Sequence, residues 1–342
     1  MAVRAAIVNV TGYVGVELAR LLFRHPEAKL VQVTGRSAAG QRLVDVFPHL
    51  APSNLKIEAE VTESVDVVFT ALPYHAAAEI APTILSSGAK MIDTSADFRL
   101  KDVAVYEEWY GKHPSPQLIG EAVYGLPELY RDQIRKARLI ANPGCYQTSA
   151  ILALAPIMDI VHPDIIVDSK SGVSGAGRTL SLTSHYSEVN ESVRAYGLAG
   201  HRHMPEIKQE LEAMYSKHQP KGSHLSFTFT PHLIPMTRGI LSTSYARLSK
   251  DLTTAELRER YLEFYRGEPF VLVAETPPQT KETWGSNIFR VYPLIDTRTG
   301  RFIVVSCLDN LVKGAAGQAI QNMNILFGLD ERTGLDSVPI YP

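Results

Sequence analysis

The feature that most constrains this chain is a strand, a tight turn, a cysteine and a helix in immediate succession. Residues 138–141 are typical of a strand end, and residues 148–158 predict a helix with an apolar side to bury. Pro143 and Gly144 form the turn between them. Cys145 is therefore expected in the first turn of the helix, where unpaired N–H groups and the positive dipole end make a thiol easier to ionise.

Cys145 has two alternative interpretations. Free cysteines are among the most buried residue types, so an isolated cysteine is most often a small packing residue. The turn before Cys145 and the helix after it instead favour a thiolate nucleophile at a helix terminus. We therefore expect Cys145 to be catalytic.

Composition limits the classes of protein to which this chain can belong. Its 342 residues suggest two domains, and 45% hydrophobic with 20% charged residues is ordinary for a globular protein. A formal net charge of −2 provides no basic field for nucleic acid or an anionic membrane, and no apolar run is long enough to span a bilayer. Only two cysteines, and an N-terminus that runs into a strand rather than a signal peptide, indicate a cytoplasmic protein.

The N-terminal residues have the layout of a dinucleotide-binding unit. The predicted strand, glycine turn, helix and second strand lie at residues 5–10, 11–15, 16–24 and 29–34. The turn has the spacing Asn9-x-x-Gly12-x-x-Gly15, which differs from the G-x-G-x-x-G fingerprint. The alternative is two glycines that close an ordinary αβ unit, but the position directly after the first strand favours a nucleotide turn.

The end of the second predicted strand favours NADP(H) over NAD(H). NAD-preferring folds place an acid there for the ribose hydroxyl, whereas a nearby Arg suits a 2′-phosphate. This chain has Arg36 and Ser37 and no acid before Asp45. Arg36 can bind phosphate with its forked guanidinium and Ser37 can donate a hydrogen bond. The alternative for Arg36 is a solvated loop residue.

Further strands at 65–72 and 90–93 alternate with a helix at 75–87, which predicts an α/β domain with a Rossmann-type doubly wound parallel sheet. Ligands of such sheets bind beyond the carboxyl ends of the strands. Pro73, Arg99 and Cys145 each follow a strand end, so we expect them to converge on one crevice.

The pattern changes after residue 158, where strands become longer and alternate polar with apolar residues. They are expected at 165–171, 224–233, 239–248, 270–274, 289–295 and 301–308. A helix at 254–266 opens with the capping box Thr253-x-x-Glu256. These elements predict an α+β domain with a mostly antiparallel or mixed sheet, one face of which a subunit interface would cover; we therefore expect a homo-oligomer.

Three interpretations compete for the motif His201-Arg202-His203, which precedes a helix beginning near Pro205. The two histidines are structural or solvated, or they bind zinc, or His203 is a general base. The sequence shows no third and fourth ligand at metal spacing, so we predict no metal site. A helix start disfavours the imidazolium, which suits a neutral base.

Two other segments have special composition. Asn310 is expected to cap a helix that runs to about residue 327, in which Gly314 and Gly317 permit close packing, most simply on the nucleotide domain. Residues 171–178 form a glycine- and serine-rich loop after a strand, either a phosphate nest or a mobile turn.

The chain resembles the N-acetyl-gamma-glutamyl-phosphate reductase family of the semialdehyde dehydrogenase superfamily over nearly its whole length. The matching motifs lie at residues 11–15, 95–99, 124–128, 142–146, 171–178, 201–207, 285–287 and 309–318. This resemblance implies that Cys145 is the nucleophile and His203 the acid/base. It also implies NADPH-dependent reduction of an acyl phosphate, in arginine biosynthesis, to a semialdehyde through a thioester.

The resemblance also assigns the parts of the chain. Residues 1–147 are expected to be the NADP-binding domain, completed by a C-terminal helix within 310–342, and residues 148–309 the catalytic and dimerisation domain. The expected cofactor contacts are Thr11, Gly12, Tyr13, Val14, Arg36, Ser37, Pro73 and Asn310. Arg99 is expected to clamp the substrate phosphate with Ser171 and its loop assisting, while Arg202 either holds a substrate carboxylate or is structural.

One departure from the family concerns Asn9, which stands where the first turn usually has Gly. Asn tolerates the left-handed backbone region better than most residues, so the turn can persist. A sister group that acts on carrier-protein-linked aminoadipyl phosphate in lysine biosynthesis lacks the Asn-Pro before Gly-Cys, which favours the arginine-pathway activity. A non-catalytic NADP-binding regulator and a structural oligomer are the remaining alternatives.

Overall fold

The computed structural model describes residues 2–51 and 53–342, which form two compact units. The first unit comprises Met1–Gly144 and Ala315–Ser337, and the second comprises Cys145–Gly314 and Val338–Pro342. Each contains a seven-stranded sheet. The expected pairing of a Rossmann-type parallel sheet with a mixed-sheet α+β unit is confirmed. The functions expected for residues 1–147 and 148–309 stay predictions.

The sheet of the first unit is parallel, with strand order β3-β2-β1-β4-β5-β7-β6. Its strands are β1 (Val3–Val8), β2 (Ala28–Thr34), β3 (Ile57–Glu58), β4 (Val67–Thr70), β5 (Lys90–Asp93), β6 (Val123–Tyr124) and β7 (Leu139–Ala141). The chain runs outward from β1 to β3 and returns to β4 on the other side of β1. This reversal creates a switch point, beyond which ligands of open parallel sheets bind.

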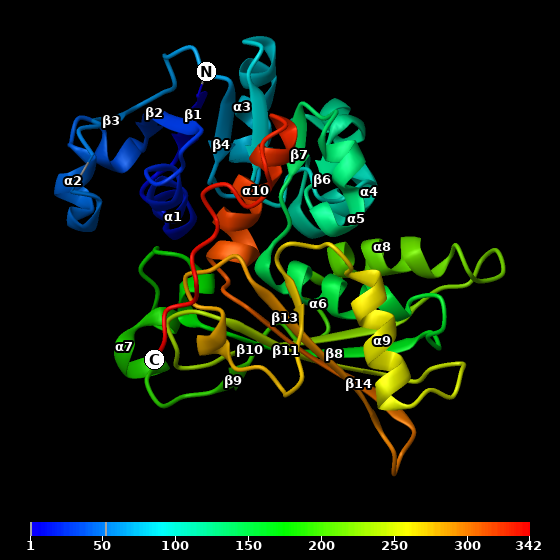
Figure 1. The fold of residues 1–342 in the computed structure, drawn as a ribbon. Coiled ribbons are helices and arrows are strands. Elements are labelled where there is room, and N and C mark those ends of the chain that lie inside the picture. The colour runs from blue at the N-terminus through cyan, green and yellow to red at the C-terminus, as the bar shows by residue number, and fades with distance from the viewer. Residues whose placement is uncertain (1, 52) are drawn as a thin grey trace. The chain divides into compact units, whose positions relative to one another are not determined.

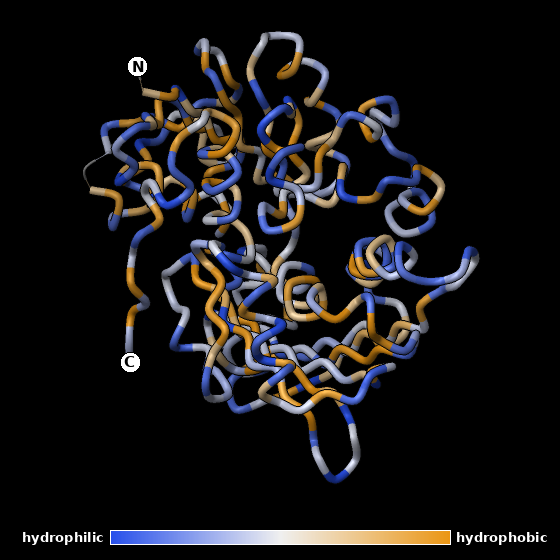
Figure 2. Tube along the Cα trace, turned by 45° about the vertical axis from the view of Figure 1, so that its right-hand side comes forward, coloured by the Kyte–Doolittle hydropathy of each residue, from blue (hydrophilic) through white to orange (hydrophobic). Residues whose placement is uncertain are grey.

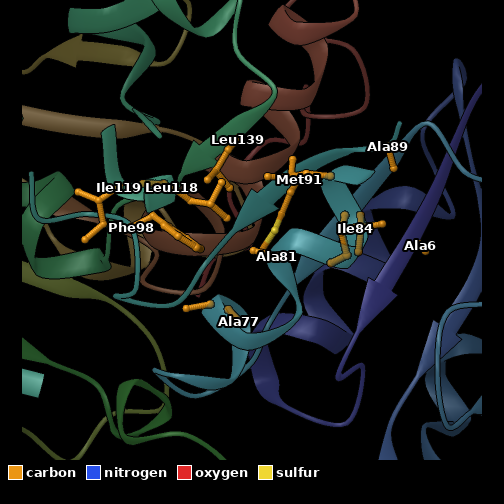
Figure 3. Packing of buried hydrophobic residues seen from close by; sticks show 14 residues of the cluster. Ala6, Ala77, Ala81, Ile84, Ala89, Met91, Phe98, Leu118, Ile119 and Leu139 are labelled. Carbon is orange, nitrogen blue, oxygen red and sulfur yellow. The ribbon is translucent and has the colours of Figure 1, made fainter. Parts of the chain in front are cut away.

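Helices pack around this parallel sheet (Figure 1). They are α1 (Tyr13–Leu22), α2 (Leu43–Val46), α3 (Ala76–Ser86), α4 (Val103–Tyr110), α5 (Pro127–Ile134) and α10 (Gly317–Leu326). Figure 3 shows Ala77, Ala81 and Ile84 of α3 among buried residues that include Met91 of β5 and Leu139 of β7. The final helix contacts α1, α5 and β5, so the C-terminal part of the chain completes the core of the first unit.

The second unit has a mixed sheet with strand order β12-β13-β14-β11-β8-β10-β9. Its strands are β8 (Asp164–Ser171), β9 (Arg194–Ala195), β10 (Ser226–Leu233), β11 (Ile240–Ala246), β12 (Val271–Val273), β13 (Phe289–Asp296) and β14 (Arg301–Leu308). The β8–β10 and β12–β13 pairs are parallel and the others antiparallel, including the predicted β13–β14 hairpin. Figure 2 shows hydrophobic stretches along these strands.

Three helices lie on one face of the mixed sheet: α6 (Cys145–Leu154) contacts β11 and β14, α8 (Met204–Tyr215) contacts β10, and α9 (Thr254–Phe264) contacts β12 and β13 (Figure 1). A short helix α7 (Tyr186–Val189) lies in the connection between β8 and α8. The capping box of α9 is confirmed, because the Thr253 hydroxyl accepts from the Glu256 N–H and the Glu256 carboxylate accepts from the Thr253 N–H. Among the described helices, none has the length and apolar character needed to cross a bilayer.

The segment before α10 differs from the expected helix start. Asp309, not Asn310, supplies the cap: its Oδ1 accepts from the N–H groups of Leu311 at 2.8 Å and Val312 at 3.3 Å. A π-helical turn, Val312–Ala316, then leads into α10, which ends at Leu326 rather than continuing through 342. Asn310 is directed elsewhere because its amide pairs with Gly239 and Ser174.

Two buried carboxylates hold the loops after β4 and β5. Asp97 accepts hydrogen bonds from the N–H groups of His75 at 2.7 Å and Ala78 at 2.9 Å, which caps α3 from a neighbouring loop. Asp93 accepts from the hydroxyls of Thr70 at 2.7 Å and Ser95 at 2.6 Å. Burial, with the Asp97 carboxylate as a second cause, raises the pKa of Asp93 from 3.8 to about 6.

Substituting Asp93→Asn tests this buried carboxyl. Its folded-state pKa is raised, so its contribution to stability is complete below about pH 4 and is lost as the pH rises through about 6. The difference in unfolding free energy, wild type minus Asp93→Asn, should fall by up to about 3 kcal/mol between these limits. Urea unfolding of both proteins at several pH values measures this difference, and a constant difference would contradict the assignment.

Candidate functional site

Cys145 is the first residue of α6, which confirms its expected position in the first turn of a helix. The remaining residues of α6, from Tyr146 to Leu154, are all buried, whereas Cys145 is half-buried. No acidic residue lies in the first turn, so no carboxylate on this turn opposes a thiolate. The N–H groups of that turn point toward the space beyond the helix start, where they can stabilise negative charge.

A cluster of buried serine hydroxyls fixes α6 on the mixed sheet. Ser149 of α6 lies 3.0 Å from the Ser242 hydroxyl of β11 and 2.9 Å from the Ser306 hydroxyl of β14. Ser242 in turn lies 2.7 Å from Ser169 of β8. Because all four side chains are fully buried, these hydrogen bonds specify where the helix sits as well as satisfying the hydroxyls.

His203 is the N-cap residue of α8, as the sequence predicts. The backbone N–H of His203 donates to Nδ1 of His201 at 3.2 Å, and the two imidazole rings meet edge to face with centroids 4.7 Å apart. Burial, with the Arg202 cation as a second cause, lowers the pKa of His201 to about 4. His201 is therefore neutral near pH 7, and its accepting Nδ1 leaves the proton on Nε2.

The aromatic ring of Tyr146 joins the start of α6 to the start of α8. Its centroid lies 6.0 Å from both the His201 and the His203 ring. The Tyr146 hydroxyl lies 3.1 Å from the Tyr196 hydroxyl and 3.2 Å from the His232 carbonyl oxygen. Burial is the main cause that raises the pKa of Tyr146, so its phenol stays protonated. The residue after Cys145 thus packs directly against His203.

A buried hydrogen bond also links the two helix starts. The Gln147 amide Nε2 donates to the Glu206 carboxylate at 2.6 Å, and both side chains are buried. Gln147 lies in the first turn of α6 and Glu206 in the first turn of α8. This bond and the Tyr146 ring hold the two catalytic candidates, Cys145 and His203, on packed helices.

The glycine- and serine-rich loop after β8 is an ordered 3-10 turn, Val173–Ala176. The N–H groups of Gly172, Val173 and Ser174 donate to carbonyl groups of residues 236–239, so they are not available as a phosphate nest. Ser171 is buried and its hydroxyl donates to the Gly172 carbonyl at 2.9 Å. Its expected contact with substrate stays a prediction.

Asn310 stabilises the same loop. Its Oδ1 accepts from the Gly239 N–H at 2.7 Å, and its Nδ2 donates to the Ser174 hydroxyl at 2.9 Å. The cofactor contact expected of Asn310 stays a prediction. The third expected substrate residue of this unit, Arg202, is exposed beside His203, so its guanidinium is accessible to an anionic ligand.

In the first unit, the turn at residues 11–14 lies between the end of β1 and the start of α1. Gly12 is the N-cap of α1 with no side-chain cap, and the first turn of this helix has no acidic residue. A Cβ on Gly15 would lie 2.3 Å from the Asn9 carbonyl oxygen, so the helix packs on the strand as closely as a dinucleotide turn requires. These features fit a pyrophosphate held by backbone N–H groups.

The other expected cofactor residues follow the neighbouring strands β2 and β4. Arg36 and Ser37 are exposed in a short turn after β2, and Pro73 is exposed after β4. Gly35 approaches the turn so closely that a Cβ there would lie 3.0 Å from the Thr11 methyl group. Adjacent parallel strands therefore bring these residues to one edge of the sheet.

Asn9 adopts the left-handed conformation that its substitution for Gly requires, with φ of 68°. Its side chain adds contacts that Gly lacks: Nδ2 donates to the Ala71 carbonyl at 2.7 Å, and Oδ1 accepts from the Thr11 hydroxyl at 3.1 Å. Asn9 thus ties the nucleotide turn to the loop after β4. This is a structural reason for the turn to persist without the usual Gly.

Arg99 lies in the loop after β5, as expected, but is buried. Its guanidinium donates to the Thr94 carbonyl at 2.7 Å. The loop also contains Asp97, which caps α3. Arg99 is therefore a rigidly supported cation beyond a strand end, and its expected contact with a phosphate stays a prediction.

Sequence reasoning missed the supporting residues of the site. His201 and Glu206 flank His203 within one motif, so that motif was a usable signal, whereas the partner Gln147 could be found only from the fold. Among the described residues, no group of three or more His, Cys, Asp and Glu side chains is arranged to hold a metal ion.

The environments of the two cysteine thiols predict selective alkylation. Cys307 is fully buried, its thiol donates to the Gln279 carbonyl at 3.3 Å, and burial raises its pKa to about 12. Iodoacetamide at pH 7.5 should therefore label Cys145 in the folded protein and reach Cys307 only after unfolding in urea. Peptide mass mapping measures both sites, and equal labelling of the folded protein would contradict this description.

Comparison with known proteins identifies both units. A family described as "Semialdehyde dehydrogenase, NAD binding domain" matches residues 4–137, and one described as "Semialdehyde dehydrogenase, dimerisation domain" matches residues 145–310. Among solved structures, aspartate semialdehyde dehydrogenase II complexed with ASA from Vibrio cholerae has a TM-score of 0.72 at 17% identity, covering 96% of this chain and 99% of that chain. The enzyme with NADP from Candida albicans has a TM-score of 0.71 at 15% identity, with the same coverage. These structures share the fold.

Curated relatives are much closer in sequence. A protein of Dehalococcoides mccartyi named N-acetyl-gamma-glutamyl-phosphate reductase is 52% identical over 342 residues, covering 99% of each chain. Proteins of the same name from Pelotomaculum thermopropionicum and Symbiobacterium thermophilum are 53% and 51% identical over the full length of both chains. The resemblance drawn from the motifs is confirmed, and this chain belongs to the N-acetyl-gamma-glutamyl-phosphate reductase family of semialdehyde dehydrogenases.

Proposed function

We propose that this chain catalyses the NADPH-dependent reduction of N-acetyl-gamma-glutamyl phosphate to N-acetylglutamate semialdehyde and inorganic phosphate, with Cys145 as the nucleophile. The observation that carries the proposal is a cysteine at the first residue of α6 whose helix packs on the helix capped by His203. Full-length relatives that are about half identical bear the name of this activity.

The first chemical step forms a thioester. The Cys145 thiolate attacks the acyl carbon of the substrate, a C–S bond forms, and the C–O bond to phosphate breaks, so phosphate leaves with the electron pair. Covalent capture divides one difficult reduction into two easier steps. The start of α6 supplies backbone N–H groups for the oxyanion that develops on the acyl oxygen.

The residues of the first unit fit NADPH. Thr11, Gly12, Tyr13 and Val14 would hold the pyrophosphate, and Arg36 with Ser37 would hold the 2′-phosphate after β2. Pro73 would line the same edge, and Asn310 of the second unit is retained as a cofactor residue. When bound, NADPH supplies the hydride that reduces the thioester carbonyl.

The second step returns the enzyme to its starting state. The tetrahedral oxyanion collapses, the C–S bond breaks, and the electron pair of that bond returns to Cys145 as a thiolate. His203, in its imidazolium form, donates a hydrogen bond to the oxyanion. His201 cannot share this role near neutral pH because its lowered pKa keeps it neutral, but its Nδ1 holds the His203 backbone.

The charged groups of the substrate need cationic partners. Arg99 is assigned to the phosphate because it is a supported cation after β5, with Ser171 assisting. Arg202 is assigned to the substrate carboxylate because it is exposed beside His203. A regulator without activity would need none of these groups. The cytoplasmic location expected from the two thiols is retained as part of the proposal.

A homodimer through the mixed sheet is a further part of the proposal. Strand register places eight apolar side chains on the sheet face opposite α6, α8 and α9. They are Ile166, Leu241, Tyr245, Leu272, Tyr292, Leu294, Ile303 and Val305. All are half-exposed or exposed, whereas the helix face of the same strands is buried. A second copy of this face would cover them.

Val305→Glu tests the interface. A carboxylate at the centre of the face would have to be buried without a partner, so the dimer should dissociate to a single chain of 37.7 kDa. Leu262→Glu on α9, on the opposite side of the sheet, should remain dimeric. Light scattering after size-exclusion chromatography measures both masses, and a dimeric Val305→Glu protein would place the interface elsewhere.

Activity is tested in the reverse direction by NADPH absorbance with N-acetylglutamate semialdehyde, NADP and inorganic phosphate. Wild-type protein should form NADPH only when phosphate is present, and Cys145→Ser should abolish the signal because a hydroxyl is a far poorer nucleophile. His203→Asn should lower the rate by about 10²-fold or more while NADPH binding, measured by its fluorescence, is retained.

Two results would contradict the proposal. Full activity of Cys145→Ser would exclude the thioester route. NADP binding without turnover of any semialdehyde would favour the non-catalytic regulator, whereas turnover of only a carrier-linked aminoadipate semialdehyde would move the substrate assignment.

A further inference from the structure

We propose that Gly314 is a positioning residue for the nucleophile: its bare backbone occupies the space beside Cys145 and sets where the first residue of α6 lies. This inference rests on the proposed role of Cys145. Gly314 lies in the π-helical turn Val312–Ala316, and π-helical turns are often found at functional sites.

The contact between the two residues is unusually close. A Cβ built on Gly314 would lie 2.5 Å from the Cys145 Cβ, 3.0 Å from its Cα and 3.2 Å from the Leu308 Cδ1 atom. Leu308 could shift the end of its side chain, but the Cys145 Cα is backbone and its Cβ has no rotamer freedom. Any side chain at position 314 therefore has to displace either α6 or the π-helical turn.

Both sides of this contact are held in place. On one side, the serine cluster and the Gln147–Glu206 bond fix the first turns of α6. On the other side, Asp309 fixes the turn: its backbone carbonyl accepts from the Gly314 N–H at 2.9 Å, and its Oδ2 accepts from the Gly285 N–H at 2.7 Å. Since neither side is free to relax, a side chain at 314 should move the thiol.

The position of Gly314 is not explained by the backbone alone. Its φ is not in the left-handed region, so no turn geometry requires a glycine there. The sequence suggested packing of Gly314 onto the nucleotide domain, but its near neighbours, Cys145 and Leu308, belong to the second unit. Proximity to the nucleophile is therefore the requirement that excludes a Cβ.

Gly314→Ala should impair chemistry more than substrate binding. Relief of the overlap needs a shift of roughly 1 Å, and a misplacement of that size costs about 10²-fold in rate. We expect kcat to fall about 100-fold, with KM and the NADPH dissociation constant changing less than about threefold. Gly120→Ala is the matched control, since a Cβ there meets nothing within 4 Å.

A direct readout of the thiol separates this role from general destabilisation. The rate of Cys145 alkylation by iodoacetamide, measured against pH in the folded protein, should change in Gly314→Ala and stay unchanged in Gly120→Ala. Unaltered alkylation together with wild-type kcat would overturn the proposal.

A double-mutant cycle tests the contact without any substrate. In a Cys145→Gly background the opposing Cβ is absent, so Gly314→Ala should lose most of its effect on Tm. An equal loss of Tm in both backgrounds would show that the added methyl meets something other than Cys145 and would overturn the proposal. Because the cycle and the alkylation rates need no turnover, both can support the role of Gly314 even if the proposed reductase activity is absent.

Discussion

The position of Cys145 depends on how α6 lies on the mixed sheet. A helix buried on all sides has no amphipathic face to orient it, so specific polar contacts must do so. Ser149 supplies them through hydroxyls on β11 and β14, and the Gln147–Glu206 bond adds a contact to α8. These buried hydrogen bonds are short, and leaving any one unmade would cost free energy. The nucleophile is therefore placed by the core of the second unit, with Gly314 closing the space on its remaining side.

The first unit solves a different problem, which is to hold an anionic dinucleotide without a full glycine fingerprint. Asn9 takes the left-handed conformation and uses its amide to join the turn at Thr11 to the loop after β4. Asp97 similarly caps α3 from the loop after β5 and supports a backbone at His75 with φ of 73°. Side chains in neighbouring loops thus stabilise conformations that residues other than glycine rarely adopt.

Much of this architecture could be predicted from the sequence because its signals are local. The capping box at Thr253, the β13–β14 hairpin and the helix beginning at Cys145 each follow from a few adjacent residues. Other features could not be predicted. Strands β3 and β6 have two residues each and show no periodicity. Asp309 and Asn310 are both good caps, and only the distant Gly239 N–H decides which is used. The Gln147–Glu206 bond likewise joins residues that the fold alone brings together.

The central claim is that Cys145 becomes acylated, and mass spectrometry of the intact protein tests it most directly. Incubated with N-acetyl-gamma-glutamyl phosphate and no NADPH, the protein should gain the mass of one acyl group per chain on the peptide that contains Cys145, with release of one phosphate. Adding NADPH should then remove the adduct and yield the aldehyde. Turnover with no adduct at Cys145, or an adduct that NADPH does not discharge, would contradict this account.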